Sequence, residues 1–243
     1  MDFAVTGLAA LAAGALNAIA GGGSFLTFPA LVWTGVPVVA ANATSAMAVS
    51  PGYLGGALGF RAELGAMSRA RLLREAALSA TGGMLGASLL LVTPERLFAG
   101  LVPWLLLFAT LLFALGGRLN AALAGYRIQS WRGPGLFLVA VYGGYFNGGL
   151  GILLMALYAL TGESVLNRVN ALKNLNSLVL SLLSVAAFVV AGSVVWTHGL
   201  WMMFWATLGG FWGARLARRL PLAWVRAGVV VTGLAMSGLF FLR

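Results

Sequence analysis

The chain has 243 residues, of which 61% are hydrophobic and 8% are charged, and it carries a formal net charge of +10. Soluble domains contain about 25% charged residues, so this composition excludes a water-soluble fold. The basic residues lie in short stretches between long apolar runs, a pattern that argues against nucleic-acid binding and is typical of cytoplasmic loops. Cysteine is absent, which excludes disulfides, thiolate catalysis and cysteine-ligated metals.

The apolar runs predict an all-α polytopic membrane protein. Lipid permits only helices and closed β-barrels, and the alternating segments of about ten residues that build a barrel do not occur. We expect about eight spanning helices, or about ten if each glycine-broken segment is counted as two pieces. The expected segments are, in chain order, 3–20, 24–35, 40–60, 72–92, 97–116, 135–146, 150–161, 170–192, 197–217 and 223–242.

Short motifs recur in the same order in the two halves of the chain. Asn17 is followed by a glycine cluster, and so is Asn147. GGMLGA at 82–87 matches GGFWGA at 209–214, and the spacing of its glycines is typical of helix contacts. Internal repeats of this kind are common in transporter folds. We predict repeat 1 at 1–117, a cytoplasmic linker at 118–133 and repeat 2 at 134–243.

The distribution of Lys and Arg indicates how the two repeats are oriented. If each segment with a glycine cluster crosses the membrane once, the 15 basic residues divide almost evenly between the two sides. If each cluster breaks its segment so that the chain turns back, every basic residue except Arg96 and Arg243 falls on one side. The positive-inside rule favours this second arrangement, which makes the repeats inverted and puts both termini outside. We therefore expect a bacterial inner-membrane protein with cytoplasmic basic loops.

The glycine clusters predict half-helices that line a cavity. Pieces such as 24–35 and 150–161 have about twelve residues, or about 18 Å of helix, which is too short to span a bilayer. Unpaired N–H groups at such breaks are tolerated only beside protein or water, and they attract anions. The alternative is that the glycines only permit tight helix packing. The expected anion-contacting residues are Asn17, Gly21, Gly22 and Gly23 in the first half and Asn147, Gly148 and Gly149 in the second.

Two further polar segments match each other, AANATSAMAVSPG at 40–52 and RVNALKNLNSLV at 168–179. Polar side chains this dense in a membrane helix usually face a cavity or a partner helix. Lys173 is the most informative of them, because a buried ammonium without a nearby carboxylate needs a counter-ion, which an anionic substrate supplies. The alternative is that its side chain extends to the headgroups. The substrate-binding residues expected here are Asn42, Thr44, Ser45, Asn170, Lys173 and Asn174.

The acidic and histidine residues indicate what the protein does not do. Cation transporters generally need buried carboxylates, and every acid in this chain is expected at a helix end or in a loop. The single histidine, His198, has no second ligand nearby, so we expect no metal site and no cofactor. No nucleophile–base set occurs, which argues against an enzyme. The acids are Asp2, Glu63, Glu75, Glu95 and Glu163.

Long motifs from both halves carry a resemblance to a known family. They are GALNAIAGGGSFLTFPALVWTGVPVVAANATSAMAVSPG in the first half, and GGYFNGGLGILL and RVNALKNLNS in the second. With these motifs the chain resembles the TauE/SafE sulfite exporter-like permeases, also called the toluene sulfonate uptake permease family, over nearly its whole length. The resemblance implies export or uptake of small sulfur-containing anions such as sulfite, sulfoacetate or related sulfonates.

These patterns predict a secondary transporter that binds a small anion between the two repeats and works by alternating access. Its expected partners are the anionic substrate and the lipid bilayer, and no nucleic acid is expected. An anion channel would use the same residues, whereas a membrane accessory factor would use none of them for transport. The sequence leaves open the anion, the direction, the coupling ion and the oligomeric state.

Overall fold

The computed structural model describes residues 2–123, 129–163, 165–216 and 222–241, and every regular element among them is a helix. This confirms the predicted all-α class, and each expected apolar segment is helical. The first half contains α1 (Asp2–Ala20), α2 (Ser24–Trp33), α3 (Val38–Gly59), α4 (Arg61–Gly65), α5 (Arg69–Val92) and α6 (Glu95–Leu123). A 3-10 turn, η1 (Gln129–Trp131), precedes α7 (Arg132–Tyr145), α8 (Leu150–Leu160), α9 (Leu166–Val190), α10 (Trp196–Leu216) and α11 (Leu222–Phe241).

The region between the halves is more helical than expected. Helix α6 continues through Leu123, into the predicted linker at 118–133, and α7 already begins at Arg132. The sequence LNAAL after Arg118 explains the longer helix, since Ala and Leu have the strongest helix propensities. The predicted linker residues 124–128, including Arg127, lie outside the described residues. The short helix α4 was not expected from the apolar pattern.

Membrane-length helices are present in both halves. Among the described residues, three helices are long and apolar enough to cross a membrane: α5, Glu95–Leu112 of α6, and α9. Several others are apolar but shorter, including Ser24–Trp33 and Leu150–Leu160. Short apolar pieces are what a broken membrane helix yields, because neither piece alone reaches across about 30 Å of hydrocarbon. The total of eight or ten crossings stays a prediction.

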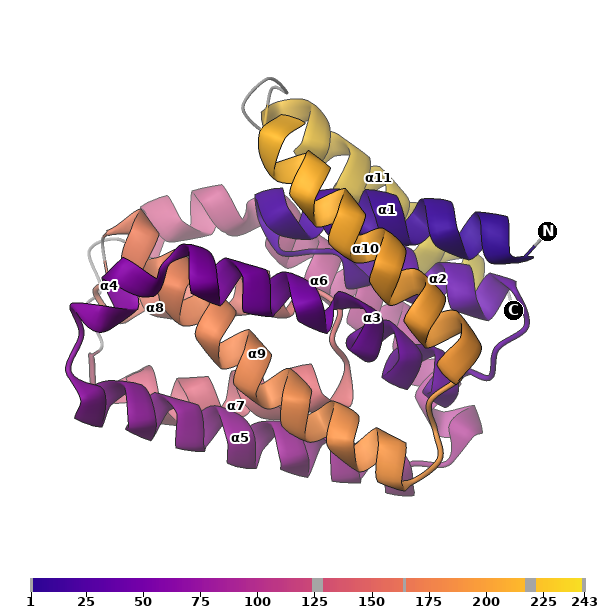
Figure 1. Cartoon of the computed structure of the whole chain (residues 1–243), viewed down its shortest axis with the longest axis horizontal. Coiled ribbons are helices and arrows are strands. Elements are labelled where there is room, and N and C mark those ends of the chain that lie inside the picture. Colours follow the sequence, from indigo (N-terminus) through magenta and orange to yellow (C-terminus); the bar gives the residue numbers. More distant parts are fainter. Residues whose placement is uncertain (1, 124–128, 164, 217–221, 242–243) are drawn as a thin grey trace.

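The two glycine-broken segments enter the fold from opposite ends (Figure 1). Helix α1 begins at the end where the N-terminus lies, and α2 returns to that end. Helix α7 begins at the other end, and α8 returns there, where Arg132 at the start of α7 donates to the backbone oxygen of Thr161 just after α8. Two helical hairpins thus point toward each other from opposite ends of the helix bundle.

Each half of the chain packs its helices against helices of the other half, an arrangement that we call helix exchange. Helix α1 of the first half packs along α10 of the second, and α7 of the second half packs along α5 of the first. Helices α3 and α9 pack against each other, as do α6 and α11. Every one of these pairs unites one helix from each half, and helices at corresponding places have corresponding partners. Inverted repeats would produce such reciprocal packing, and the duplication itself stays a prediction.

Backbone-to-backbone contacts at glycines hold the exchanged helices together. A methyl group added at Gly82 would stand 2.8 Å from the backbone oxygen of Phe137 in α7, and one added at Gly209 would strike the backbone oxygen of Leu11 in α1. Small residues let helices approach this closely in membranes, where dispersion contacts replace the hydrophobic effect as the attractive force. The predicted helix-contact role of these glycine motifs is confirmed for α5 and for Gly209 in α10.

We expect Gly86→Ala to destabilise the protein strongly. Its methyl group would strike the backbone oxygen of Val141 and stand 2.7 Å from the backbone nitrogen of Tyr145, so α5 and α7 would be forced apart. Overpacking of this kind typically costs about 1–3 kcal/mol. The control is Gly100→Ala in α6, where an added methyl group meets no atom within 4 Å. Thermal melting of both variants in detergent tests this, and equal melting temperatures would contradict it.

Candidate functional site

The two hairpins turn at glycines that no other residue replaces easily. Gly21 and Gly149 both have a φ of +76°, in the left-handed region where an L side chain is strained. Helices α2 and α8 begin at Ser24 and Leu150, directly after these turns. The backbone oxygen of Gly149 accepts from the first turn of α8, and those of Gly22 and Gly23 accept from the first turn of α2, so the turns themselves satisfy most of the first N–H groups of these helices.

The two turns touch each other. A methyl group added at Gly151 would stand 2.8 Å from the backbone oxygen of Gly21, and one added at Gly21 would stand 3.3 Å from the Cα of Gly151. The backbones of the two hairpins therefore meet with no side chain between them. Since the hairpins come from opposite ends of the bundle, this contact marks its middle along that direction.

Lys173 reaches this contact from α9. Its Nζ lies 3.6 Å from the position that a methyl group on Gly21 would take, and the residue is only 6% exposed. No described residue forms an ion pair or hydrogen bond with the ammonium. One helical turn further along α9, the buried Oγ of Ser177 also has no hydrogen-bond partner among the described residues. Unsatisfied buried polar groups are rare in native structures, and these two lie one turn apart on one face of α9.

Asparagine side chains from both halves surround the same region. Helix α3 has glycines one turn apart, with the amide of Asn17 against Gly52 and the amide of Asn174 against Gly56. Between these glycines, the hydroxyl of Tyr53 donates to Oδ1 of Asn147 over 3.3 Å. We call Asn17, Gly21, Asn147, Gly151, Lys173 and Asn174 the Lys173 cluster.

The expected residues of α3 bond to neighbouring segments of the fold. Asn42 donates to the backbone oxygen of Tyr145, at the end of α7, and Ser45 shares a 2.6 Å hydrogen bond with Thr27 of α2. The hydroxyl of Thr44 accepts from the backbone nitrogen of Val195, between α9 and α10. About 18 Å of α3, at 1.5 Å per residue, separates Thr44 from Gly56, which lies beside Asn174. Each of these three side chains thus has a contact within the fold, and Asn42 and Ser45 bond to the two glycine-broken segments.

The remaining expected residues flank the turns. Asn170 is half-buried on α9, just before Lys173. The backbone oxygen of Gly148 accepts from the hydroxyl of Tyr142, and Gly22 lies against the ring of Phe25. A methyl group on Gly23 would stand 2.8 Å from the backbone oxygen of Ala13. Gly23 therefore serves close packing beside the turn.

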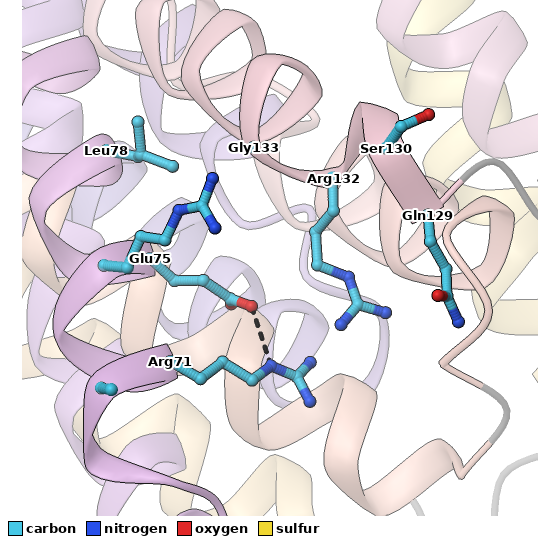
Figure 2. Close-up of a pocket in the computed structure, with 9 residues that line it drawn as sticks. Arg71, Glu75, Leu78, Gln129, Ser130, Arg132 and Gly133 are labelled. Atoms are coloured by element: carbon cyan, nitrogen blue, oxygen red, sulfur yellow. Dashed lines mark hydrogen bonds and ion pairs between the residues drawn. The ribbon is translucent and has the colours of Figure 1, made fainter.

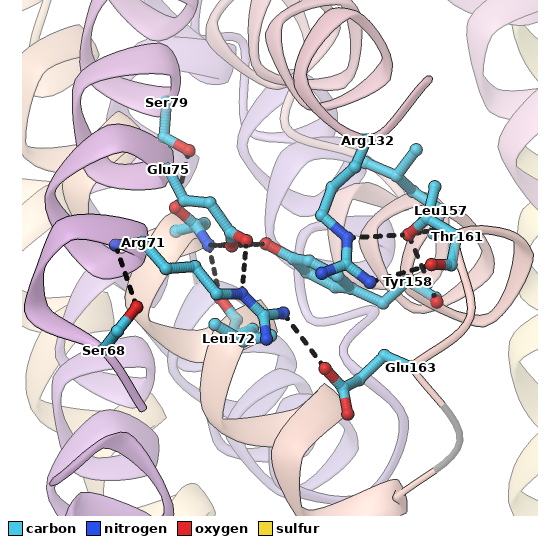
Figure 3. A network of polar contacts seen from close by, with 11 residues as sticks. Ser68, Arg71, Glu75, Ser79, Arg132, Leu157, Tyr158, Thr161, Glu163 and Leu172 are labelled. Atoms are coloured by element: carbon cyan, nitrogen blue, oxygen red, sulfur yellow. Dashed lines mark hydrogen bonds and ion pairs between the residues drawn. The ribbon is translucent and has the colours of Figure 1, made fainter. Parts of the chain in front are cut away.

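A buried carboxylate corrects the expectation that the chain offers none. Glu75 is 4% exposed in the second turn of α5 (Figure 3). Its Oε1 accepts from Arg71 over 3.0 Å, and its Oε2 accepts from the hydroxyl of Tyr158 over 2.7 Å and from Asn176 over 3.4 Å. The absence of buried carboxylates therefore no longer argues against cation transport. Lys173 is then the main feature that favours an anion, and it forms no ion pair with Glu75.

The Glu75 network also ties three helices to one end of the fold. Arg71 of α5 bonds to Glu163 after α8 as well as to Glu75, both over 3.0 Å. Asn176 of α9 donates to Tyr158 of α8 over 2.7 Å and accepts from Ser79 of α5 over 2.8 Å. Sequence reasoning missed the roles of Glu75, Tyr158 and Tyr53. The paired glycines of α3 are the one signal in the sequence that could have indicated a polar contact near Tyr53.

His198 forms no metal site with other described residues. It lies in the first turn of α10, where its ring stacks on Phe3 with centroids 4.8 Å apart. The described part of the chain contains no group of three His, Cys, Asp or Glu residues able to hold a metal ion.

Comparison with known proteins places the chain among membrane transporters. It is 29% identical to a probable membrane transporter protein, ORF9, of Sinorhizobium over 89% of this chain and 82% of that protein. The probable membrane transporter protein YfcA of Escherichia coli K12 is 28% identical over 94% of this chain and 85% of its own length. No solved structure is similar enough to count as a match. The model of the sulfite exporter TauE/SafE family matches residues 6–240, and the chain belongs to that family.

Proposed function

We propose that the protein is a secondary transporter of a small sulfur-containing oxyanion, such as sulfite or an organosulfonate, which binds at the Lys173 cluster. The observation that supports this most is the buried Lys173 ammonium beside the contact of two helix breaks, without a carboxylate partner among the described residues. A buried unpaired charge is costly, so a protein retains one where a ligand of opposite charge completes it.

The donors around Lys173 suit an oxyanion. An ammonium has three donor hydrogens, and each asparagine amide adds further donors. Sulfite and sulfonate groups have three oxygens that accept hydrogen bonds from different directions. Several separate donors therefore match them better than the two parallel N–H groups of a single guanidinium. The close glycine contact at Gly21 and Gly151 favours a small ligand over a bulky one. The name of the family supports sulfite as the first anion to test.

Alternating access would act through the two hairpins. At one end, Arg71 bonds to Glu163 and Arg132 bonds to Thr161. At the other end, the backbone nitrogen of Val38 donates to Glu95 over 2.9 Å. If the contacts at one end break while those at the other end remain, the Lys173 cluster becomes open to one side of the membrane at a time. Rocking of two repeats requires this. We propose that the end with Arg71 and Arg132 faces the cytoplasm of a bacterial inner membrane.

Counterflow distinguishes a carrier from the alternative of an anion channel. Proteoliposomes loaded with unlabelled sulfite should transiently accumulate labelled sulfite above its equilibrium level, because a carrier exchanges one bound anion for another. A channel would let the label rise steadily to equilibrium without an overshoot. Absence of any sulfite or sulfonate flux, with empty liposomes as the baseline, would instead favour an accessory factor without transport of its own.

A further inference from the structure

A second polar feature lies away from the Lys173 cluster. A cavity of about 450 Å³ opens between α5, η1 and the first turn of α7 (Figure 2). Its lining includes Arg71, Arg74 and Glu75 from α5, Gln129 and Ser130 from η1, and Arg132 from α7. None of these residues belongs to the Lys173 cluster, although Arg71 and Arg132 also form the contacts that we propose to break when this end opens.

The charges that line this cavity are not balanced. Arg71 is neutralised by Glu75 and Glu163, which it contacts at 3.0 Å each. Among the described residues, Arg132 donates only to the hydroxyl and backbone oxygen of Thr161, both of which are neutral. Arg74 has no hydrogen-bond or ion-pair partner among the described residues. Three guanidinium groups and two carboxylates leave an excess of one positive charge here, and neither Arg74 nor Arg132 forms an ion pair with a described carboxylate.

Gly133 keeps the cavity open between α5 and α7. A methyl group there would stand 3.6 Å from a terminal nitrogen of Arg74 and 3.8 Å from Leu78. Arg74 of α5 thus extends to the start of α7, beside Arg132. The missing side chain at Gly133 leaves space beside the guanidinium group of Arg74.

We infer that this cavity is a second anion site, which binds a phosphate- or sulfonate-type oxyanion between Arg74 and Arg132. Guanidinium groups form forked hydrogen bonds to such oxygens, and Gln129 and Ser130 add neutral donors. Two sources supply this chemistry: a free oxyanion such as phosphate, and the headgroup of an anionic phospholipid. Trp131 and Leu73 beside the cavity are 60% and 63% exposed, so acyl chains of a lipid would find apolar partners next to the headgroup.

Melting temperatures of the purified full-length chain in detergent test this site. The ligands are sodium phosphate against sodium chloride of equal ionic strength, and phosphatidylglycerol against phosphatidylcholine. We expect phosphate, phosphatidylglycerol or both to raise the melting temperature of the wild type. Arg74→Gln should weaken the response about tenfold in ligand concentration, as expected for one lost charge-assisted hydrogen bond. A response to phosphate identifies a free oxyanion as sufficient, and one to phosphatidylglycerol alone identifies the lipid.

Three further variants test whether the change in melting temperature comes from this cavity. Arg69→Gln removes an exposed cation from the same helix outside the cavity and should respond like the wild type. Gly133→Leu fills the cavity without changing any charge and should lose the response. Lys173→Met should retain it, which separates this site from the transport site. If neither ligand acts on the wild type, or if Arg74→Gln and Arg69→Gln respond alike, the second site does not exist.

Discussion

Replacing Lys173 with methionine should abolish anion transport and raise the melting temperature of the ligand-free protein. Methionine preserves most of the side-chain length but removes a buried charge that has no partner among the described residues. Replacing buried charged groups by apolar ones of similar volume often stabilises a protein by about 1–4 kcal/mol. Losing one partner of a buried charge pair costs about 2–5 kcal/mol in binding, which corresponds to roughly 30-fold to several thousand-fold in affinity.

Because transport should fall while the melting temperature rises, the experiment separates a binding role of Lys173 from a structural one. A residue that only stabilises the fold would lower both stability and transport when it is replaced. Arg168→Gln is the matched control, because it removes an exposed cation from the first turn of the same helix. Sulfite counterflow and thermal melting are measured on wild type and both variants. Transport by Lys173→Met at the wild-type rate would overturn the proposed binding site.

Replacing Glu75 with alanine should be among the most destabilising single substitutions in the chain. It would leave the guanidinium of Arg71 with only Glu163, and it would remove the acceptor of the buried Tyr158 hydroxyl. Breaking a buried ion pair by deleting one partner costs about 3–5 kcal/mol. Glu75→Gln retains the shape of the side chain and one acceptor oxygen, so we expect it to be less destabilising than Glu75→Ala.

Glu63→Ala provides the control for Glu75→Ala. It makes the same change of charge in the short helix α4, where Glu63 has no ion pair with another described residue. Thermal melting in detergent should place Glu75→Ala far below wild type and Glu63→Ala close to it. Equal melting temperatures for the two alanine variants would show that the Glu75 network does not stabilise the fold.

The helices and their breaks were predictable because their signals are local. Apolar runs of sufficient length specify membrane helices whatever their partners are, and glycine clusters interrupt them visibly. The same holds for Lys173, since a cation inside an apolar run is conspicuous wherever the helix packs. These features need no knowledge of which segments meet in space.

The role of Glu75 was not predictable, because its surroundings come from distant parts of the chain. The acid follows the charged stretch RARLLR, which by sequence alone resembles a solvated helix end. Its partners Tyr158 and Asn176 lie 83 and 101 residues further along. Thr44 illustrates the converse, since a polar residue that binds the backbone at Val195 looks the same in sequence as one that binds a ligand.

The exchange of helices between the halves determines when the protein can assemble during its synthesis. Helix α1 packs along α10, and the backbone oxygen of Phe3 accepts from the indole of Trp201, 198 residues later. Helix α5 likewise cannot pack against its partner α7 until α7 has been made. Chains generally fold N-terminal part first as they leave the ribosome. Here the first helices inserted remain in the bilayer with their glycine faces uncovered until their partners in the second half have been translated, so the N-terminal half cannot complete its packing by itself.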